Sequence, residues 1–163
     1  MSVTVVSGLA GGEDTEAVLA AVGSEMVTGP VLTEDDLVRL AGEADAVIVG
    51  ATKPYTRWVI ERLSKCRVIS RTGIGYNNID ADAATDEGIA VAIVLDASID
   101  EVSGHAIALM LAFSRKLVAV DRLVRQGVWQ TGRTEIAQVR KPTFRLTDQT
   151  VCVVGAGRIG AAF

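Results

Sequence analysis

The sequence predicts a doubly wound α/β fold built around a parallel sheet. Short runs rich in valine and isoleucine recur at residues 3–6, 25–27, 46–49, 67–69 and 89–91. The runs stay apolar without alternating with polar residues, which is typical of strands covered by helices on both faces. Segments of helical period separate them, as the crossover connections between parallel strands require.

Helix signals lie between these runs. Thr33 is a predicted N-cap because three acidic residues follow it, where the helix dipole favours negative charge, and the helix should end near Gly42. Residues 80–87 form another short helix, which Gly88 ends. A further helix follows Pro54, and its predicted apolar face consists of Trp58, Ile60 and Leu63.

Beyond Ser98 the pattern becomes one long apolar stripe at helical spacing that ends near Gly127. A helix of that length would extend roughly 40 Å at about 1.5 Å per residue, longer than a small sheet needs, so it could bridge two domains. We therefore predict a substrate domain at 1–98, an interdomain helix at 99–127, a linker with little secondary structure at 128–149, and the start of a second domain at 150–163.

Composition excludes several classes of partner. The chain has 163 residues, with 16 lysines and arginines against 20 acidic residues and no basic run, which argues against binding nucleic acid or an anionic membrane.

Cys66 and Cys152 lie in apolar segments without metal-ligand spacing, so we expect reduced core thiols and no metal site. The N-terminus lacks a signal-peptide pattern, and the longest apolar stretch, 106–113, is too short to span a membrane. We expect a soluble, cytoplasmic protein.

A glycine-rich turn lies at the end of the chain. Residues 150–154 form a predicted buried strand, and Gly155, Gly157 and Gly160 follow in a G-x-G-x-x-G pattern. In a Rossmann unit these glycines allow a tight turn, the approach of a dinucleotide pyrophosphate, and close packing of the next helix. The acidic residue that binds the ribose normally lies about 20 residues further on, so we expect an incomplete site. A glycine turn without a ligand is the alternative.

A second glycine motif follows the predicted strand at 67–69. It runs from Arg71 through Gly73 and Gly75 to Asp80, at the carboxyl end of a strand, where ligands of open parallel sheets bind. Its glycines leave backbone amides accessible to an anion such as a carboxylate. In the alternative interpretation, the segment is a tight turn in which Asn77 and Asn78 satisfy local backbone groups and cap the next helix.

Two other residues could carry chemistry. His105 is the only histidine, and Glu101 lies one helical turn before it, where it could orient the ring. A lone helical histidine near an apolar face is more often structural, and Ser103 points away from it and makes no nucleophile pair. Lys53 follows another predicted strand and could face the same cleft, although a solvated lysine is the more common case.

The order of these features resembles the D-isomer-specific 2-hydroxyacid dehydrogenases. Residues 71–80 are similar to the family's substrate loop, 83–91 to the helix and strand after it, and 101–115 to its domain-crossing helix. The stretch 123–129 and the glycine turn lean towards the branch of phosphoglycerate dehydrogenases and C-terminal binding protein corepressors. The resemblance implies a flavodoxin-like substrate domain followed by a Rossmann NAD(P)-binding domain.

The resemblance also implies roles for particular residues. Ile74 and Gly75 would present backbone amides to the substrate carboxylate, and Val102 would lie beside the nicotinamide. The pyrophosphate of NAD, with NADP not excluded, would be held by Gly155, Gly157, Arg158, Ile159 and Gly160. The family's catalytic arginine, glutamate and histidine belong beyond Phe163, so no catalytic residue is expected within this chain, and His105 is not that histidine. Ser103 and Gly104 also replace an alanine and an acid found in many relatives.

The sequence therefore favours part of an NAD(P)-dependent oxidoreductase that acts on the CH–OH group of a small D-2-hydroxy acid and reversibly reduces the 2-oxo acid. The chain alone is expected to be incomplete and inactive, and the full-length protein to be a homodimer. The rival hypothesis is a dinucleotide-sensing binding module or corepressor on the same scaffold, because fold does not decide function. A third is an unstable remnant that exposes the apolar segment near Val151.

Overall fold

A computed structural model describes residues 2–6 and 13–163 of the chain. These residues divide between Ala97 and Ser98 into two units, Met1–Ala97 and Ser98–Phe163. The first unit carries the sheet, and the second consists of helices and extended segments.

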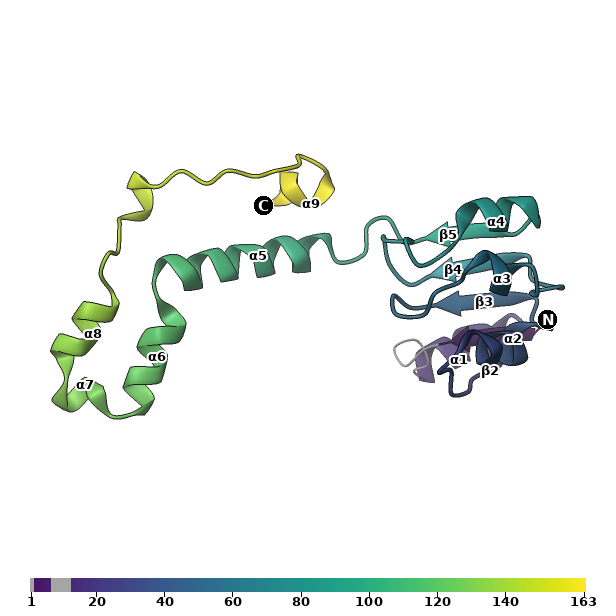
Figure 1. Ribbon diagram of the computed structural model, residues 1–163, viewed down its shortest axis with the longest axis horizontal. Helices are drawn as coiled ribbons and strands as arrows, with labels where there is room; N and C mark the ends of the chain where they lie inside the picture. Colours follow the sequence, from purple (N-terminus) through teal and green to yellow (C-terminus); the bar gives the residue numbers. More distant parts are fainter. Residues whose placement is uncertain (1, 7–12) are drawn as a thin grey trace. The chain divides into compact units, whose positions relative to one another are not determined.

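The sheet has five strands, and every pairing in it is parallel. The strands are β1 (Ser2–Val6), β2 (Glu25–Val27), β3 (Ala46–Val49), β4 (Val68–Arg71) and β5 (Ala90–Ile93). They lie side by side in the order β2-β1-β3-β4-β5 (Figure 1). This is the flavodoxin-like order, so the predicted fold class is confirmed, and each strand begins within one residue of its predicted run.

The helix α2 (Glu34–Ala41) begins where the sequence predicts it, at a reciprocal cap. The Thr33 hydroxyl accepts a hydrogen bond from the Asp36 amide at 3.2 Å, and the Asp36 carboxylate accepts one from the Thr33 amide at 3.0 Å. The Leu32 amide also donates to this carboxylate. The hydrogen bonds from the Leu32 and Thr33 amides lower the pKa of Asp36 to about 2.

The other helices of the first unit are α1 (Glu13–Ala21), α3 (Arg57–Ile60) and α4 (Ala81–Asp86). Asp80 caps α4 by accepting a hydrogen bond from the Ala83 amide at 2.9 Å, and Gly88 follows with a φ of +70°. The helix α1 lies between the first two strands, where a helical segment was predicted without bounds, and its Val18 is 67% exposed. Trp58 was wrongly placed on the buried face of α3: it lies at the surface beneath the Arg62 guanidinium.

The core of the first unit lies on the face of the sheet that α2, α3 and α4 cover. Val47, Val49 and Ile69 are fully buried there, whereas the residues that alternate with them in β3 and β4 are half-buried. The continuous apolar runs predicted strands that are buried on both faces. Among the side chains that the structure describes, full burial is seen on one face of the sheet. The core cluster consists of Val31, Leu37, Ala41, Val47, Val49, Tyr55, Val59, Ile60, Leu63, Cys66, Ile69, Ile79, Ala83, Ala84 and Ile89.

The second unit corrects two predictions. Residues 99–127 do not form one helix, because α5 (Ile99–Ser114) ends and α6 (Leu117–Arg125) begins around Lys116, whose φ is +57°. A left-handed residue cannot continue an α-helix, although the apolar spacing persists on both sides of it. Residues 128–149 are not a linker poor in secondary structure, since α7 (Val128–Thr131), α8 (Arg133–Val139) and the 3₁₀-helix η1 (Leu146–Asp148) lie there.

The predicted strand at 150–154 is also wrong. The segment has no strand assignment, and Val154 is 98% exposed. A β-strand needs a neighbour to receive its backbone hydrogen bonds, and no other part of the described second unit is a strand. Cys152 is accordingly exposed, while Cys66 is buried as predicted.

The last helix, α9 (Arg158–Ala162), contacts α5, and Figure 1 shows it beside the first turns of that helix. None of the described helices is long and apolar enough to span a membrane.

Candidate functional site

A cavity of about 400 Å³ opens at the carboxyl ends of β3 and β4. Its lining residues come from the last residue of β4 and from the loops that follow the two strands: Ala51, Arg71, Gly75, Asn77 and Asn78. Carboxyl ends of parallel strands meet at one edge of the sheet, so two loops far apart in sequence share this cavity.

The loop after β4 is fixed to the strand beside it. The Thr72 amide and hydroxyl both donate to the Val49 carbonyl, at 3.0 and 3.2 Å. On the other side, the Val94 amide donates to the Gly73 carbonyl at 3.2 Å. Hydrogen bonds to the last residue of β3 and to the residue that follows β5 therefore hold the start of this loop in one place.

Asn78 holds the far end of the loop. Its Nδ2 donates to the Gly50 carbonyl at 3.1 Å and to the Lys53 carbonyl at 2.8 Å, and its own carbonyl accepts a hydrogen bond from the Tyr55 amide at 2.6 Å. The bonds reach across to the loop after β3, so Asn78 does not satisfy local groups as the alternative interpretation supposed. The cap of α4 is Asp80.

Ile74 and Gly75 lie between these two fixed ends. Ile74 is half-buried and Gly75 exposed, and open space surrounds the position that a Cβ of Gly75 would take. Neither amide donates a hydrogen bond to any described residue. Two neighbouring backbone donors therefore remain available in a fixed loop beside the cavity, which is the arrangement that binds a small anion.

The glycine turn of the second unit has its own requirements. Gly155 has a φ of +100°, a conformation that L side chains rarely adopt, and a Cβ on Gly160 would overlap the Gly155 carbonyl oxygen. Nothing lies within 4 Å of the position that a Cβ of Gly157 would take. Arg158 and Ile159 begin α9 directly after it. Two glycines thus permit the turn and the third leaves its backbone open, which fits a dinucleotide pyrophosphate.

The remaining candidates lie on α5. Val102 is 45% exposed, whereas Ser103 is buried and its hydroxyl donates to the Asp100 carbonyl at 3.2 Å. His105 is exposed, and no described hydrogen bond or ion pair joins it to Glu101. The orienting partner that a catalytic histidine needs is therefore not supplied by Glu101 in this structure.

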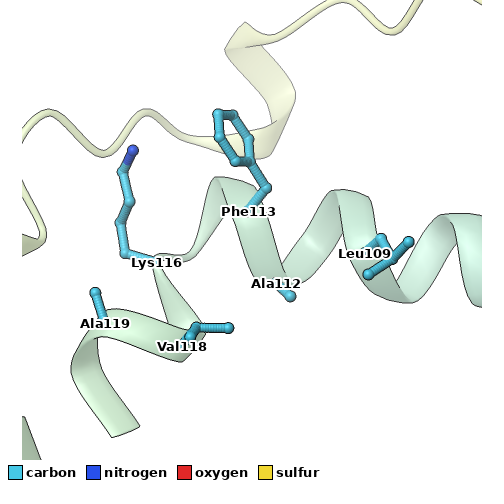
Figure 2. Close-up of a pocket in the computed structure, with 6 residues that line it drawn as sticks. All are labelled: Leu109, Ala112, Phe113, Lys116, Val118 and Ala119. Atoms are coloured by element: carbon cyan, nitrogen blue, oxygen red, sulfur yellow. The ribbon is translucent and has the colours of Figure 1, made fainter. Parts of the chain in front are cut away.

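An apolar hollow of about 320 Å³ lies at the bend between α5 and α6. Figure 2 shows Phe113 and Lys116 extending from this bend towards the same side, and the Lys116 Nζ lies 5.1 Å from the centre of the Phe113 ring. Phe113 is 77% and Val118 71% exposed. The second unit therefore presents apolar side chains at its surface there.

Sequence reasoning missed two contributions to the site. Asn78 was assigned a local role, and its bridge between loops depends on the sheet order, which no local pattern contains. Arg71, which lines the cavity, was given no role in the motif. Its place at the end of a strand and before two glycines could have indicated that it lies at the site. Lys53 is half-buried and does not line the cavity. No cluster of potential metal ligands occurs within residues 2–6 and 13–163.

Comparisons with known proteins agree with this arrangement. The sequence profile of the D-isomer specific 2-hydroxyacid dehydrogenase catalytic domain matches residues 4–154. A D-3-phosphoglycerate dehydrogenase of Methanocaldococcus jannaschii is 36% identical over 149 residues, covering 91% of this chain and 27% of the relative. A glyoxylate reductase of Thermococcus litoralis is 32% identical over 126 residues, covering 77% of this chain and 38% of the relative. The chain thus spans between a quarter and two fifths of these relatives' lengths.

Solved structures share the fold. A putative D-isomer specific 2-hydroxyacid dehydrogenase of Polaromonas is 26% identical with a TM-score of 0.72, and the match covers 99% of this chain and 50% of that one. A formate dehydrogenase of Staphylococcus aureus in complex with NAD is 22% identical with a TM-score of 0.79, over 99% of this chain and 51% of that one. The sheet order, the two glycine motifs and the profile match lead to one conclusion: the chain belongs to the D-isomer specific 2-hydroxyacid dehydrogenase family.

Proposed function

We propose that this chain carries the substrate loop and the first part of the cofactor site of an NAD(P)-dependent oxidoreductase. The reaction would interconvert a small D-2-hydroxy acid and its 2-oxo acid. The observation that carries this proposal is that the backbone N–H groups of Ile74 and Gly75 donate no described hydrogen bond. They lie at the edge of a cavity, in a loop whose two ends are held by hydrogen bonds. The names of the relatives, phosphoglycerate dehydrogenases and glyoxylate reductases, support the substrate class.

The residues divide the work between the two units. In the first unit, the Ile74 and Gly75 amides bind the substrate carboxylate and orient C2. In the second, Gly155, Gly157 and Gly160 hold the pyrophosphate with the Arg158 and Ile159 backbone, and Val102 lies beside the nicotinamide. When bound, NAD or NADP supplies the hydride acceptor or donor, which no side chain can provide. Residues 1–98 would then be the substrate domain and 150–163 the beginning of the cofactor domain.

Proton transfer is not assigned to this chain. His105 is its only histidine, and it is exposed on α5 without the carboxylate partner that would orient it. We therefore expect residues 1–163 alone to show no turnover of glyoxylate or hydroxypyruvate. Measurable reduction of either acid by the purified chain would contradict this assignment.

We further propose that the complete enzyme is a cytoplasmic homodimer. Exposed apolar side chains on α5 and α6, among them Phe113 and Val118, support an association through the second unit. Light scattering of the complete protein tests this, and a monomer at micromolar concentration would contradict it.

The substrate site is tested by NMR titration of the ¹⁵N-labelled chain with pyruvate, a small 2-oxo acid. The Ile74 and Gly75 amide signals should shift with a common saturation curve, because their N–H groups would donate to the carboxylate. Gly88, in the turn before β5, serves as a reporter remote from the motif and should not move. Shifts confined to other residues, or none, would refute the proposed substrate loop. A parallel titration with NAD⁺ should move Gly155, Gly157 and Gly160.

A further inference from the structure

A cavity of about 190 Å³ lies in the second unit, where α7 contacts α8. Its lining residues are Trp129, Arg133, Ile136, Ala137 and Arg140, and it shares none of them with the cavity beside β4 or with the glycine turn. Residues three, four and seven positions apart lie on one side of a helix, so α8 and its C-cap turn both arginines and the two apolar residues between them towards this cavity.

The two arginines have no anionic partner. Neither Arg133 nor Arg140 forms an ion pair within the part of the chain that the structure describes, whereas Arg39, Arg57 and Arg125 each pair with a carboxylate. The Arg133 guanidinium lies instead 5.4 Å from the centre of the Trp129 ring. A guanidinium keeps its proton in proteins, so both positive charges persist at the cavity.

Acidic side chains are scarce around this cavity. Residues 128–145 include four basic side chains and a single acidic one, Glu135. Glu135 does not line the cavity, and its Cδ lies 3.3 Å from the position that a Cβ of Gly132 would take, at the start of α8. The cavity is therefore lined by two cations and no anion, and an anionic ligand would complement it.

The arrangement favours a phosphate group over a carboxylate. A phosphate monoester carries a charge close to −2 near neutral pH and has three acceptor oxygens, so one group can pair with two guanidinium groups. The Cα atoms of Arg133 and Arg140 lie roughly 10 Å apart along the helix, and long arginine side chains can converge over such a distance. Ile136 is 5% exposed and Trp129 53%, so an apolar wall is available to the carbon part of an ester.

We propose that this cavity binds the phosphate group of a small phosphate monoester, with Arg133 and Arg140 as its two cationic groups. The Trp129 ring is a positioning group, because its contact with the Arg133 guanidinium holds that side chain over the cavity before a ligand arrives. The site does not depend on the proposed function, since it requires neither a 2-hydroxy acid nor a dinucleotide.

Tryptophan fluorescence of residues 1–163 tests the site. The chain has two tryptophans, so Trp58→Phe leaves Trp129 as the sole reporter. Titration of this variant with glycerol 3-phosphate should change the fluorescence with a saturating curve. Adding Arg133→Met or Arg140→Met should weaken binding about 10- to 100-fold, the range for lost hydrogen bonds to a charged group. Arg122→Met is the matched control, an exposed arginine on α6 that does not line the cavity, and should leave the affinity unchanged.

NMR of the unmodified chain gives a second measurement that needs no variant to fold. The Nε–H signals of Arg133 and Arg140 should both shift with glycerol 3-phosphate and should stay in place with acetate at the same ionic strength. Absence of a saturating change in the fluorescence and in these signals would overturn the proposal. Equal weakening by Arg122→Met would also overturn it, because general charge attraction would then explain the binding.

Two further outcomes test the choice of ligand and of place. Acetate that binds as tightly as the ester, or inorganic phosphate that binds more tightly, would overturn the choice of a phosphate monoester. Shifts of the Gly155 and Gly157 amides while the two arginine signals stay fixed would assign the phosphate to the glycine turn and overturn the site on α8.

Discussion

Replacing Tyr55 with phenylalanine should make the first unit more stable. Tyr55 is 1% exposed in the core, and its hydroxyl is buried without a hydrogen-bond partner, while its backbone joins the two loops of the candidate site. Leaving a buried polar group unsatisfied costs about 1–3 kcal/mol. Removing one oxygen atom opens a void of roughly 10–20 Å³, which costs about 0.2–0.5 kcal/mol at ~24 cal/mol per Å³. The free energy of unfolding should therefore rise by about 1–2 kcal/mol.

Urea unfolding and calorimetry of both proteins measure this difference. For a unit of about a hundred residues, 1 kcal/mol corresponds to an increase of about 4–8 °C in the melting temperature. Tyr55→Leu is the control, since it removes the hydroxyl and also the ring packing, and it should lower the melting temperature. A lower midpoint for Tyr55→Phe would refute the reasoning, because it would show that the hydroxyl has a stabilising partner in solution.

Tyr55→Phe should also change how the free energy of unfolding depends on alkaline pH. Burial, with a smaller contribution from Cys66, raises the pKa of Tyr55 above its usual value, and burial raises the pKa of the Cys66 thiol as well. A pKa raised in the folded state gives stability that is present at lower pH and is lost as pH rises past the unfolded value. Stability should thus decline above about pH 8.5 through Cys66 and further above about pH 10 through Tyr55, and Tyr55→Phe should remove the second decline.

Three further outcomes are expected. Asp36→Asn should lower the urea midpoint at neutral pH, with the difference from the unmodified chain vanishing as pH falls from about 4 towards 2, because the lowered pKa of this carboxyl gives stability that protonation removes. Asn78→Asp should cost about 2 kcal/mol in urea unfolding, since it directs an acceptor at two carbonyls, and a smaller loss than Asn78→Ala would contradict this. Gly157→Ala should leave melting of the second unit unchanged but weaken NAD⁺ binding in a fluorescence titration, whereas Gly160→Ala should impair both; equal melting of the two variants would show that the turn tolerates a side chain at 160.

The sequence predicted the first unit well because its signals are local. Thr33 and Asp36 form a cap within four residues, and Gly88 takes the left-handed conformation that ends α4. The parallel sheet also follows from apolar runs separated by helices, whose spacing needs no long-range information. The contribution of Asn78 could not be predicted, because its acceptors, Gly50 and Lys53, lie more than twenty residues earlier and become neighbours only in the finished sheet order.

The errors in the second unit have a different physical origin. Apolar periodicity persists through the bend at Lys116, so a hydrophobic stripe cannot show where one helix ends and the next begins. Residues 151–154 have strong strand preference, but β structure requires a partner strand and the preference of one segment cannot supply it. The same segment would be correctly predicted as a strand in any fold that placed a neighbour beside it.

The glycine turn shows the contrast within a few residues. Gly155 keeps its positive φ and Gly160 its close approach to the Gly155 carbonyl although the segment before them is not in a sheet. The turn is therefore encoded by its own glycines, whereas the strand leading into it depends on tertiary context. The substrate loop differs again, since Thr72 and Asn78 fix both of its ends to neighbouring strands and loops. A site held in this way is preorganised within the first unit, which is why binding of a carboxylate is the activity that these residues should retain by themselves.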